Sequence, residues 1–382
     1  MLLISRLLFL PTQKGSQPLT NLMFKTSISL LFIIGLLFSP QAQSKELKVV
    51  ISDVNVPWGM VQLSATQWLV SERDGELLLF DLATNKKHPI ANLPKISDRG
   101  QGGLLDLELH PNYKANGWIY FSFSSPEGEG RGSNTAVMRA KIQDYQLVSK
   151  ELLYKATPNT TKGHHFGSRI EFDQAGYLYF SVGDRGDRDT NPQDIERDAG
   201  KIYRLHDDGR IPKDNPFIKN SKPAIYSYGH RNPQGMAMHP VTGNIWTHEH
   251  GPKGGDEINV IAKGKNYGWP IISYGVNYSG SKFTEISEKE GMEQPVWYWV
   301  PSIAPSGMTF VTSDKYPQWK GQLLVGSLKF GYLVLCKIEN NKVVSQQIVY
   351  EGLGRTRNVK QMPDGYIYAA VEGKGIVRLD AQ

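Results

Sequence analysis

The chain has 382 residues, with 43 lysines and arginines against 37 aspartates and glutamates and a formal net charge of +6. This length can bury a large core in one domain or two, and because no basic stripe or run occurs, nucleic acid is excluded as an expected partner. The single cysteine, Cys336, excludes an internal disulfide in any compartment.

The first 44 residues predict a cleavable secretory signal rather than part of the fold. Three basic residues and no acids precede an apolar run at 30–38, which is too short to span a bilayer comfortably. Small residues follow at 42–44, and Met23, directly before the pattern, is an alternative start. The competing interpretation is an N-terminal membrane anchor. Cleavage predicts a periplasmic or secreted domain, residues 45–382, that is not stably inserted in a membrane.

A weak internal repeat predicts the architecture of the rest. The unit is two apolar residues at i and i+2, a turn and a short strand, and its copies are spaced by 47, 63, 66, 72 and 51 residues. Each spacing has room for a four-stranded antiparallel blade with insertions. Six copies predict an all-β, six-bladed β-propeller, with a large β-sandwich or two stacked domains as the poorer alternatives. The copies begin at Met60, Leu107, Ile170, Met236, Met308 and Val359.

The same repeat sorts residues between the two faces of the ring. The early strand 47–51 and the late strand 375–380 could share a blade and close it. Two antiparallel strands joined by a turn begin and end on one side, so His110 and His239 are expected in turns on the other. The unusual polar residues fall on the shared side, which predicts a site at that mouth. They lie in segments 100–103, 163–169, 183–187, 229–235, 249–257, 327–330 and 354–357.

The segment 249–257, EHGPKGGDE, favours a hard cation. Kinked glycine-rich backbone exposes carbonyl oxygens, and Asp256 and Glu257 add carboxylates, which are the ligands that calcium takes. His248 and His250 point the same way, but no nearby thiol completes a zinc site. No helical pattern follows Asp256, which disfavours a phosphate loop. A glycine-rich surface loop with solvated acids remains the plain alternative.

Other polar residues of this mouth suit an anionic ligand and a proton transfer. Guanidinium groups pair bidentately with carboxylates, and a histidine beside an acid can abstract a proton. Either His164 or His165 could be the base, and Asp184 returns to the same face one hairpin later. The cations are Arg231, Lys329, Arg355 and Arg357, and the amides are Gln101 and Asn232.

Four long motifs resemble those of the soluble quinoprotein sugar dehydrogenases, the glucose/sorbosone dehydrogenase family. They are HFGSR at 165–169, YGHRNPQGMAMHP at 228–240, EHGPKGGDEIN at 249–259 and GKNYGWP at 264–270. The likeness is closest to the periplasmic aldose sugar dehydrogenases that use pyrroloquinoline quinone (PQQ) and calcium. That family folds as a six-bladed propeller, in agreement with the repeat count.

The resemblance implies oxidation of an aldose at C1 to a lactone. His165 would take the proton of the C1 hydroxyl, Asp184 would hold its ring, and Arg231 would lie near the cofactor carbonyls that receive the hydride. Spacing to the GSR triplet favours His165 over His164 as the base. The reduced cofactor would pass its electrons to a quinone or cytochrome acceptor that the sequence does not identify.

The resemblance also implies the ligands of the cofactor and of two calcium ions. The backbone carbonyls of Gly251 and Pro252 would hold a calcium that touches the cofactor, and Glu257 and Tyr267 would belong to a second, structural calcium. The side chains implied to bind PQQ are Gln101, Arg231, Asn232, Lys329, Arg355 and Arg357.

Other interpretations stay open on sequence alone. A calcium-dependent propeller hydrolase of the lactonase type is the runner-up, although such a site has no need of four cations. A non-catalytic binding propeller would lack the base and its acid, and a lectin-like sugar receptor would bind aldoses without oxidising them. The aromatic stretch VWYWVPS at 296–302 could form part of the sugar rim or a buried strand edge.

Overall fold

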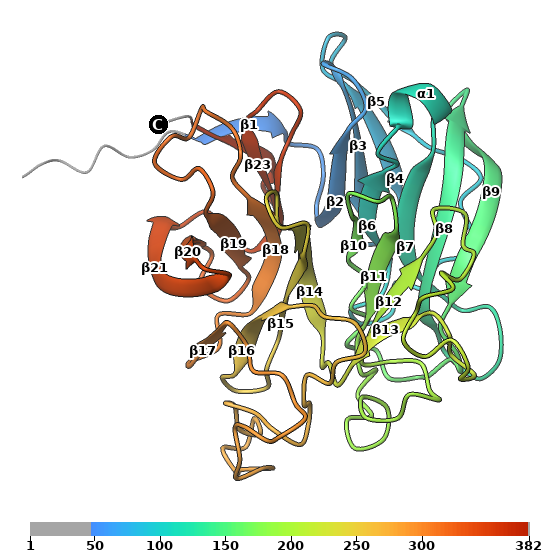
Figure 1. The fold of residues 1–382 in the computed structure, drawn as a ribbon. Helices are drawn as coiled ribbons and strands as arrows, with labels where there is room; N and C mark the ends of the chain where they lie inside the picture. Colours follow the sequence, from blue (N-terminus) through green and yellow to red (C-terminus); the bar gives the residue numbers. More distant parts are fainter. Residues whose placement is uncertain (1–46, 381–382) are drawn as a thin grey trace, which may run out of the picture. The chain divides into compact units, whose positions relative to one another are not determined.

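The computed structural model describes residues 47–380, which form a β-propeller of six four-stranded antiparallel blades (Figure 1). The predicted all-β, six-bladed fold is thereby confirmed. The predicted signal at 1–44 lies outside the described residues. Within residues 47–380, no helix has the length and apolar character needed to cross a membrane.

Each repeat copy forms the first two strands of one blade, and the blades follow one another along the chain. Blade 1 contains β2 (Pro57–Gln62), β3 (Gln67–Glu72), β4 (Leu77–Asp81) and β5 (Lys86–Pro89). Blade 2 contains β6 (Leu104–Leu109), β7 (Ile119–Ser125), β8 (Asn134–Gln143) and β9 (Gln146–Lys155), with the short helix α1 (Tyr113–Asn116) between β6 and β7. Blade 3 contains β10 (Ile170–Phe172), β11 (Leu178–Val182), β12 (Lys201–Leu205) and β13 (Ile225–Tyr228).

The last three blades include the one that closes the ring. Blade 4 contains β14 (Pro233–Met238), β15 (Ile245–Glu249), β16 (Asp256–Val260) and β17 (Trp297–Trp299). Blade 5 contains β18 (Pro305–Phe310), β19 (Leu323–Ser327), β20 (Leu333–Glu339) and β21 (Lys342–Tyr350). Blade 6 joins β22 (Thr356–Gln361), β23 (Ile367–Val371) and β24 (Gly375–Leu379) to the early strand β1 (Leu47–Ile51). The predicted closure is confirmed, because β1 pairs antiparallel with β24.

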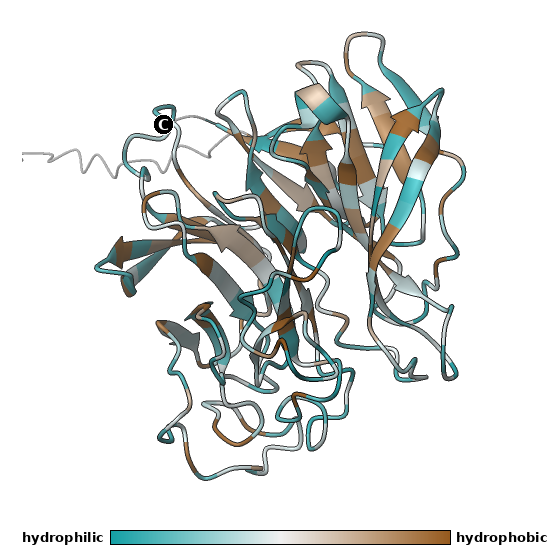
Figure 2. Ribbon diagram, turned by 45° about the vertical axis from the view of Figure 1, so that its right-hand side comes forward, coloured by the Kyte–Doolittle hydropathy of each residue, from teal (hydrophilic) through white to brown (hydrophobic). Residues whose placement is uncertain are grey.

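The hydrophobic core is distributed around the ring instead of being central. Six buried clusters each join residues of two neighbouring blades, such as Leu69 with Phe121 between blades 1 and 2, and Trp68 with Tyr368 between blades 1 and 6. Figure 2 shows hydrophobic residues along the strands and hydrophilic ones in many of the connecting loops. Sheet-on-sheet packing of this kind fixes each blade against the next, so the inner strands can hold polar groups at defined places.

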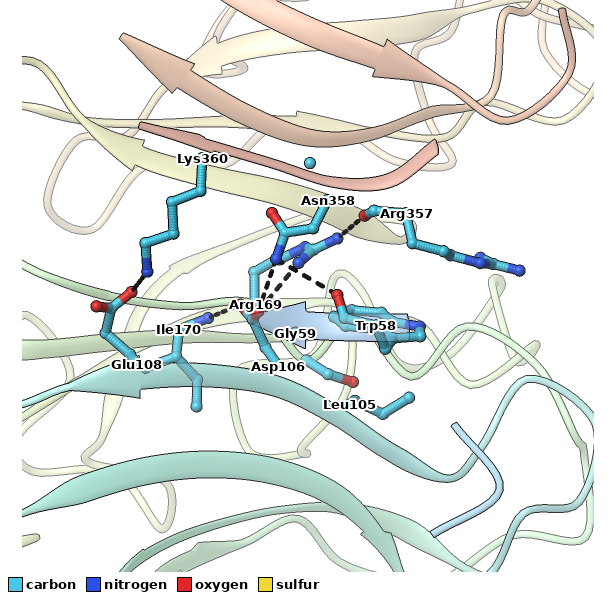
Figure 3. Close-up of polar contacts among 12 residues, drawn as sticks. Trp58, Gly59, Leu105, Asp106, Glu108, Arg169, Ile170, Arg357, Asn358 and Lys360 are labelled. Carbon is cyan, nitrogen blue, oxygen red and sulfur yellow. Dashed lines mark hydrogen bonds and ion pairs between the residues drawn. The ribbon is translucent and has the colours of Figure 1, made fainter. Parts of the chain in front are cut away.

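A buried arginine, Arg169, contacts the inner strands of several blades (Figure 3). Arg169, directly before β10, pairs with Asp106 of β6 at 3.0 Å and donates to the carbonyls of Gln234 and Arg357 at 2.7 and 2.5 Å. Its guanidinium carbon lies 4.0 Å from the ring centroid of Trp58 in β2. One side chain thus joins residues from five blades.

The histidines expected on the turn side lie in turns between the first two strands of their blades. The Nδ1 atom of His110 accepts the backbone N–H of Asn112 at 2.9 Å. The Nδ1 atom of His239 accepts those of Val241 and Thr242, each at 3.2 Å. Both side chains therefore close local turns, as predicted, on the face opposite the polar segments.

Candidate active site

The polar segments expected at one mouth surround a single cavity of about 810 Å³. Its floor contains Trp58, Leu105 and Phe166, a buried apolar cluster from blades 1, 2 and 3. This combination of an apolar floor with a polar wall is typical of a cofactor or substrate pocket. The sequence-predicted residues that line it are Gln101, Asn232, Gly251, Pro252, Lys329, Arg355 and Arg357.

His165 and Asp184 form a hydrogen-bonded pair beside this cavity. The Nδ1 atom of His165 lies 2.7 Å from Oδ1 of Asp184, and the backbone N–H of His165 donates to Oε1 of Gln101 at 2.9 Å. An ionised carboxylate can only accept, so Nδ1 carries the proton and Nε2 is left as the acceptor. His164 packs edge-on against the His165 ring, with the centroids 4.5 Å apart, and is not bonded to Asp184.

The environment keeps this pair as a neutral imidazole and a charged carboxylate. Burial lowers the pKa of His165 to about 4, and the charge of Arg231 acts in the same direction against the opposing effect of Asp184. Burial alone would raise the pKa of Asp184, but the hydrogen bond from His165 and the charge of Arg231 bring it below its usual value. At neutral pH, the imidazole of His165 is therefore neutral and can accept a proton at Nε2. The charged carboxylate of Asp184 holds the ring in place.

Arg185 fixes the loop that carries His165, and sequence reasoning missed it. The backbone of His165 adopts a left-handed conformation with φ of 59°, which is unfavourable for a side chain with a Cβ. The buried guanidinium of Arg185 donates to the carbonyls of His164 and Lys162 and lies over the ring of Phe166. Its place in the polar segment 183–187 offered a signal, but nothing in the pattern showed that the side chain turns inward.

Arg231 and Asn232 lie between this pair and the neighbouring blade. A guanidinium N–H of Arg231 donates to the carbonyl of His250 at 2.9 Å, and the backbone carbonyl of Arg231 accepts the N–H of Asp184 at 2.7 Å. Oδ1 of Asn232 accepts the N–H of Gly167 at 3.1 Å. Both residues are buried, and Arg231 lies behind the cavity wall formed by Asn232.

One wall of the cavity carries more positive than negative charge. Glu372 accepts from Arg355 at 2.8 Å and from Arg357 at 2.5 Å, and these two charges hold its pKa below the usual value although burial opposes them. Lys329 adds a third cation against this one carboxylate. The surplus suits a ligand with more than one carboxylate, because each guanidinium can form charge-assisted hydrogen bonds.

The 250–257 segment presents backbone carbonyls to the same cavity. Asp256 anchors it, because its Oδ1 accepts the N–H of Gly251 at 2.9 Å while its Oδ2 accepts those of Ile303 and Ala304. A Cβ at Gly251 would lie 2.2 Å from the carbonyl oxygen of Gly254, so only glycine fits. The carbonyls of Gly251 and Pro252 accept no hydrogen bond from residues 47–380, which leaves them available to a cation.

A second, much smaller void lies behind Gly251. Its volume of about 10 Å³ corresponds to one water or ion, and Glu249, Glu257 and Tyr267 line it. Burial, and then the charge of Glu249, raise the pKa of Glu257 well above its usual value. The hydroxyl of Tyr267 is engaged elsewhere, since it donates to Val260 and accepts from Ala262, so this residue can offer only its carbonyl. Within the described residues, no cluster of three or more His, Cys, Asp or Glu side chains is arranged for a metal.

The aromatic stretch 296–302 includes the outer strand of blade 4 and the residues directly after it. Trp299 is buried and donates its indole N–H to Gln346 at 2.6 Å, as expected of a strand edge. Tyr298 is exposed and stacks on Tyr274, with the ring centroids 3.8 Å apart. The residues that follow, 300–302, line the main cavity, but none of them is aromatic, so a role of the stretch in the sugar rim stays a prediction.

Comparisons with known proteins cover nearly all of the described chain. A model of the Glucose / Sorbosone dehydrogenase family matches residues 54–378. The aldose sugar dehydrogenase YliI of Escherichia coli (strain K12) is 40% identical over 324 residues, which cover 83% of this chain and 87% of that protein.

Two solved structures share the fold. The apo-form of the soluble aldose sugar dehydrogenase from Escherichia coli has a TM-score of 0.83 at 37% identity, with 89% of this chain and 100% of that chain covered. The PQQ-bound form of the aldose sugar dehydrogenase from Streptomyces coelicolor has a TM-score of 0.71 at 27% identity, with 88% and 98% covered.

Proposed function

Because the chain belongs to the glucose/sorbosone dehydrogenase family, we propose that it is an aldose sugar dehydrogenase that oxidises C1 of the sugar to a lactone with bound PQQ. The observation that carries the reaction is the His165–Asp184 pair, half-buried at the histidine and buried at the carboxylate, beside a cavity with a cationic wall. A periplasmic or secreted location remains a prediction from the N-terminal sequence.

His165 acts as the general base. Its Nε2 accepts the proton of the C1 hydroxyl, and the C1 hydride leaves with its electron pair as the C1–O bond becomes a carbonyl. Asp184 keeps the proton on Nδ1 and stabilises the imidazolium that forms. PQQ supplies the acceptor for the hydride, and a calcium ion beside it supplies Lewis acidity. Arg231 adds positive charge on the same side as the imidazole.

The charges and positions of the side chains around the cavity support the following assignment of the residues that hold PQQ. Lys329, Arg355 and Arg357 bind its carboxylates, since only Glu372 offsets them. Gln101 and Asn232 present amides to the same cavity, and Gln101 is bonded to the backbone of the base. The carbonyls of Gly251 and Pro252 hold the calcium, and Glu257 with the carbonyl of Tyr267 holds a second calcium at the small void.

The loss of activity at acid pH should follow the protonation of His165. Its pKa of about 4 means that kcat/KM for glucose stays level from neutral pH to about pH 5 and falls about tenfold per pH unit below about pH 4. The sign follows from the chemistry, since protonation removes the base. The measurement is kcat/KM against pH in a buffer series of constant ionic strength. A midpoint near the unperturbed value of about 6.5 would contradict a buried base.

Binding of the second calcium should raise the melting temperature of the protein. At a free ion concentration of about 100 Kd, a bound ion adds about 2.7 kcal/mol, or roughly 4 °C in Tm for a domain of this size. Chelation of the PQQ-free protein should lower Tm by that amount, and Glu257→Gln should abolish the difference. The exposed Glu285→Gln is the control and should keep it. A Tm that does not respond to chelator would contradict the second site.

The whole proposal is tested by reconstitution. Purified protein stripped with chelator is assayed for dye reduction with glucose and other aldoses, first with calcium and then with calcium and PQQ. Activity that appears only with both supports the proposal. Dye reduction that does not respond to PQQ, combined with hydrolysis of a lactone, would instead support the calcium-dependent hydrolase.

A further inference from the structure

Asp184 is held at both of its oxygens, by different parts of the fold. Oδ1 accepts from His165 and from the backbone N–H of Gly186, each at 2.7 Å. Oδ2 accepts the indole N–H of Trp269 at 2.9 Å, the one donor to that oxygen within residues 47–380. Without it, the carboxylate would be fixed at one oxygen and could rotate about its broad terminal torsion.

Trp269 is itself immobilised, although it lies in the long connection between β16 and β17. Its backbone N–H donates to the carbonyl of Gly229 at 2.9 Å, and its own carbonyl accepts from the side chain of Gln193 at 2.7 Å. The side chain is buried and Phe283 packs edge-on against it. The indole is therefore a rigid donor, aimed at Asp184 from a loop of another blade.

The same ring also faces Arg231. The guanidinium carbon of Arg231 lies 5.3 Å from the Trp269 ring centroid, within the range of a cation–π contact. One indole thus contacts both the partner of the base and the cation proposed to act at the cofactor. The side chain of Trp269 thus contacts both Arg231 and the His165–Asp184 pair and fixes one relative to the other.

We propose that Trp269 is a positioning residue of the reaction, which orients the Asp184 carboxylate so that His165 presents a single tautomer to the sugar. This rests on the proposed function. Trp269 touches neither the sugar nor the cofactor in this role and acts through Asp184.

The test compares two buried indoles. W269F removes the N–H and keeps a ring, and W246F makes the same change at a buried indole whose N–H has no partner among the described residues. In enzyme loaded with PQQ and calcium, W269F should lower kcat about tenfold, the worth of one hydrogen bond, and change KM for glucose less than about twofold. W246F should leave both unchanged.

A readout without turnover separates orientation from packing. In the cofactor-free protein, the ¹⁵N signals of the His165 ring should show the Nδ1-protonated tautomer in wild type and W246F, and a mixture of tautomers in W269F. This NMR measurement does not need turnover, so it can be made even if no aldose is oxidised. A failure of the role proposed for Trp269 can therefore be distinguished from a failure of the proposed function. Equal kcat losses in both variants, or an unchanged tautomer in W269F, would overturn the proposal.

If W269F does not fold, a second measurement can be made on protein that keeps Trp269. The indole proton signal of Trp269 should move upfield in D184N, because a neutral amide oxygen accepts a weaker hydrogen bond than a carboxylate. An unmoved signal would show that the indole does not depend on the charge of Asp184, and would overturn the proposal.

Discussion

His165→Gln should lower kcat for aldose oxidation by about a thousandfold, within the 10²–10⁴ range typical of a lost general base. Glutamine keeps polarity and approximate size, but its amide cannot accept a proton at neutral pH. The measurement is steady-state dye reduction at saturating PQQ and calcium, with a PQQ titration of each variant. Affinity for PQQ should change little, because the cationic side chains proposed to bind its carboxylates are unchanged in this variant.

The neighbouring histidine provides the matched control. His164 packs against His165 and makes no bond to Asp184, so His164→Gln should retain most of kcat. The assignment of the base to His165 would be wrong if His164→Gln lost as much activity as His165→Gln. A large loss of PQQ affinity in His165→Gln would show that the residue holds the cofactor instead.

Arg169→Met should lower the free energy of unfolding by about 3–5 kcal/mol, the usual cost of breaking a buried ion pair on one side. Methionine fills a similar volume but leaves Asp106 charged and buried. The carboxylate keeps a hydrogen bond from the N–H of Ile170 at 3.0 Å, which does not neutralise it. The carbonyls of Gln234 and Arg357 lose their donor as well.

Urea unfolding followed by tryptophan fluorescence measures this change. Lys282→Met, in an exposed pair with Glu285, is the control and should change stability by less than about 1 kcal/mol. Partial recovery in the double variant Arg169→Met, Asp106→Leu would show that the uncompensated charge is the cause. Wild-type stability in Arg169→Met would contradict a network that joins five blades.

Most of the fold could be predicted because each blade begins with a similar hairpin, and four of the six copies have apolar residues two apart. Leu107 and Ile170 begin copies nearly identical in pattern, and both lie in the first strand of a blade. The same alternation predicted which side each segment faces, and so gathered residues as distant as Gln101 and Arg357 around one cavity. Turn-side residues such as His110 followed from the same rule.

The inward-facing supports of the site could not be predicted. Arg169, Arg185 and Trp269 are two charged residues and an aromatic in glycine-rich segments, which usually lie at the surface. Their burial depends on carbonyls and carboxylates contributed by other blades, and no local pattern reports contacts at such separations in sequence. The resemblance assigned roles to the residues around the cofactor and was silent about those that hold them in place.

Because β1 pairs with β24, the ring can close only after the last part of the described chain has been synthesised. Arg355 and Arg357 belong to blade 6, whose sheet is complete only when 375–379 pairs with 47–51. A nascent polypeptide that has reached blade 5 already contains His165 and Asp184, yet it lacks Arg355 and Arg357 of the pocket. The anionic cofactor proposed above can therefore contact both arginines only after blade 6 has been synthesised and its sheet has closed.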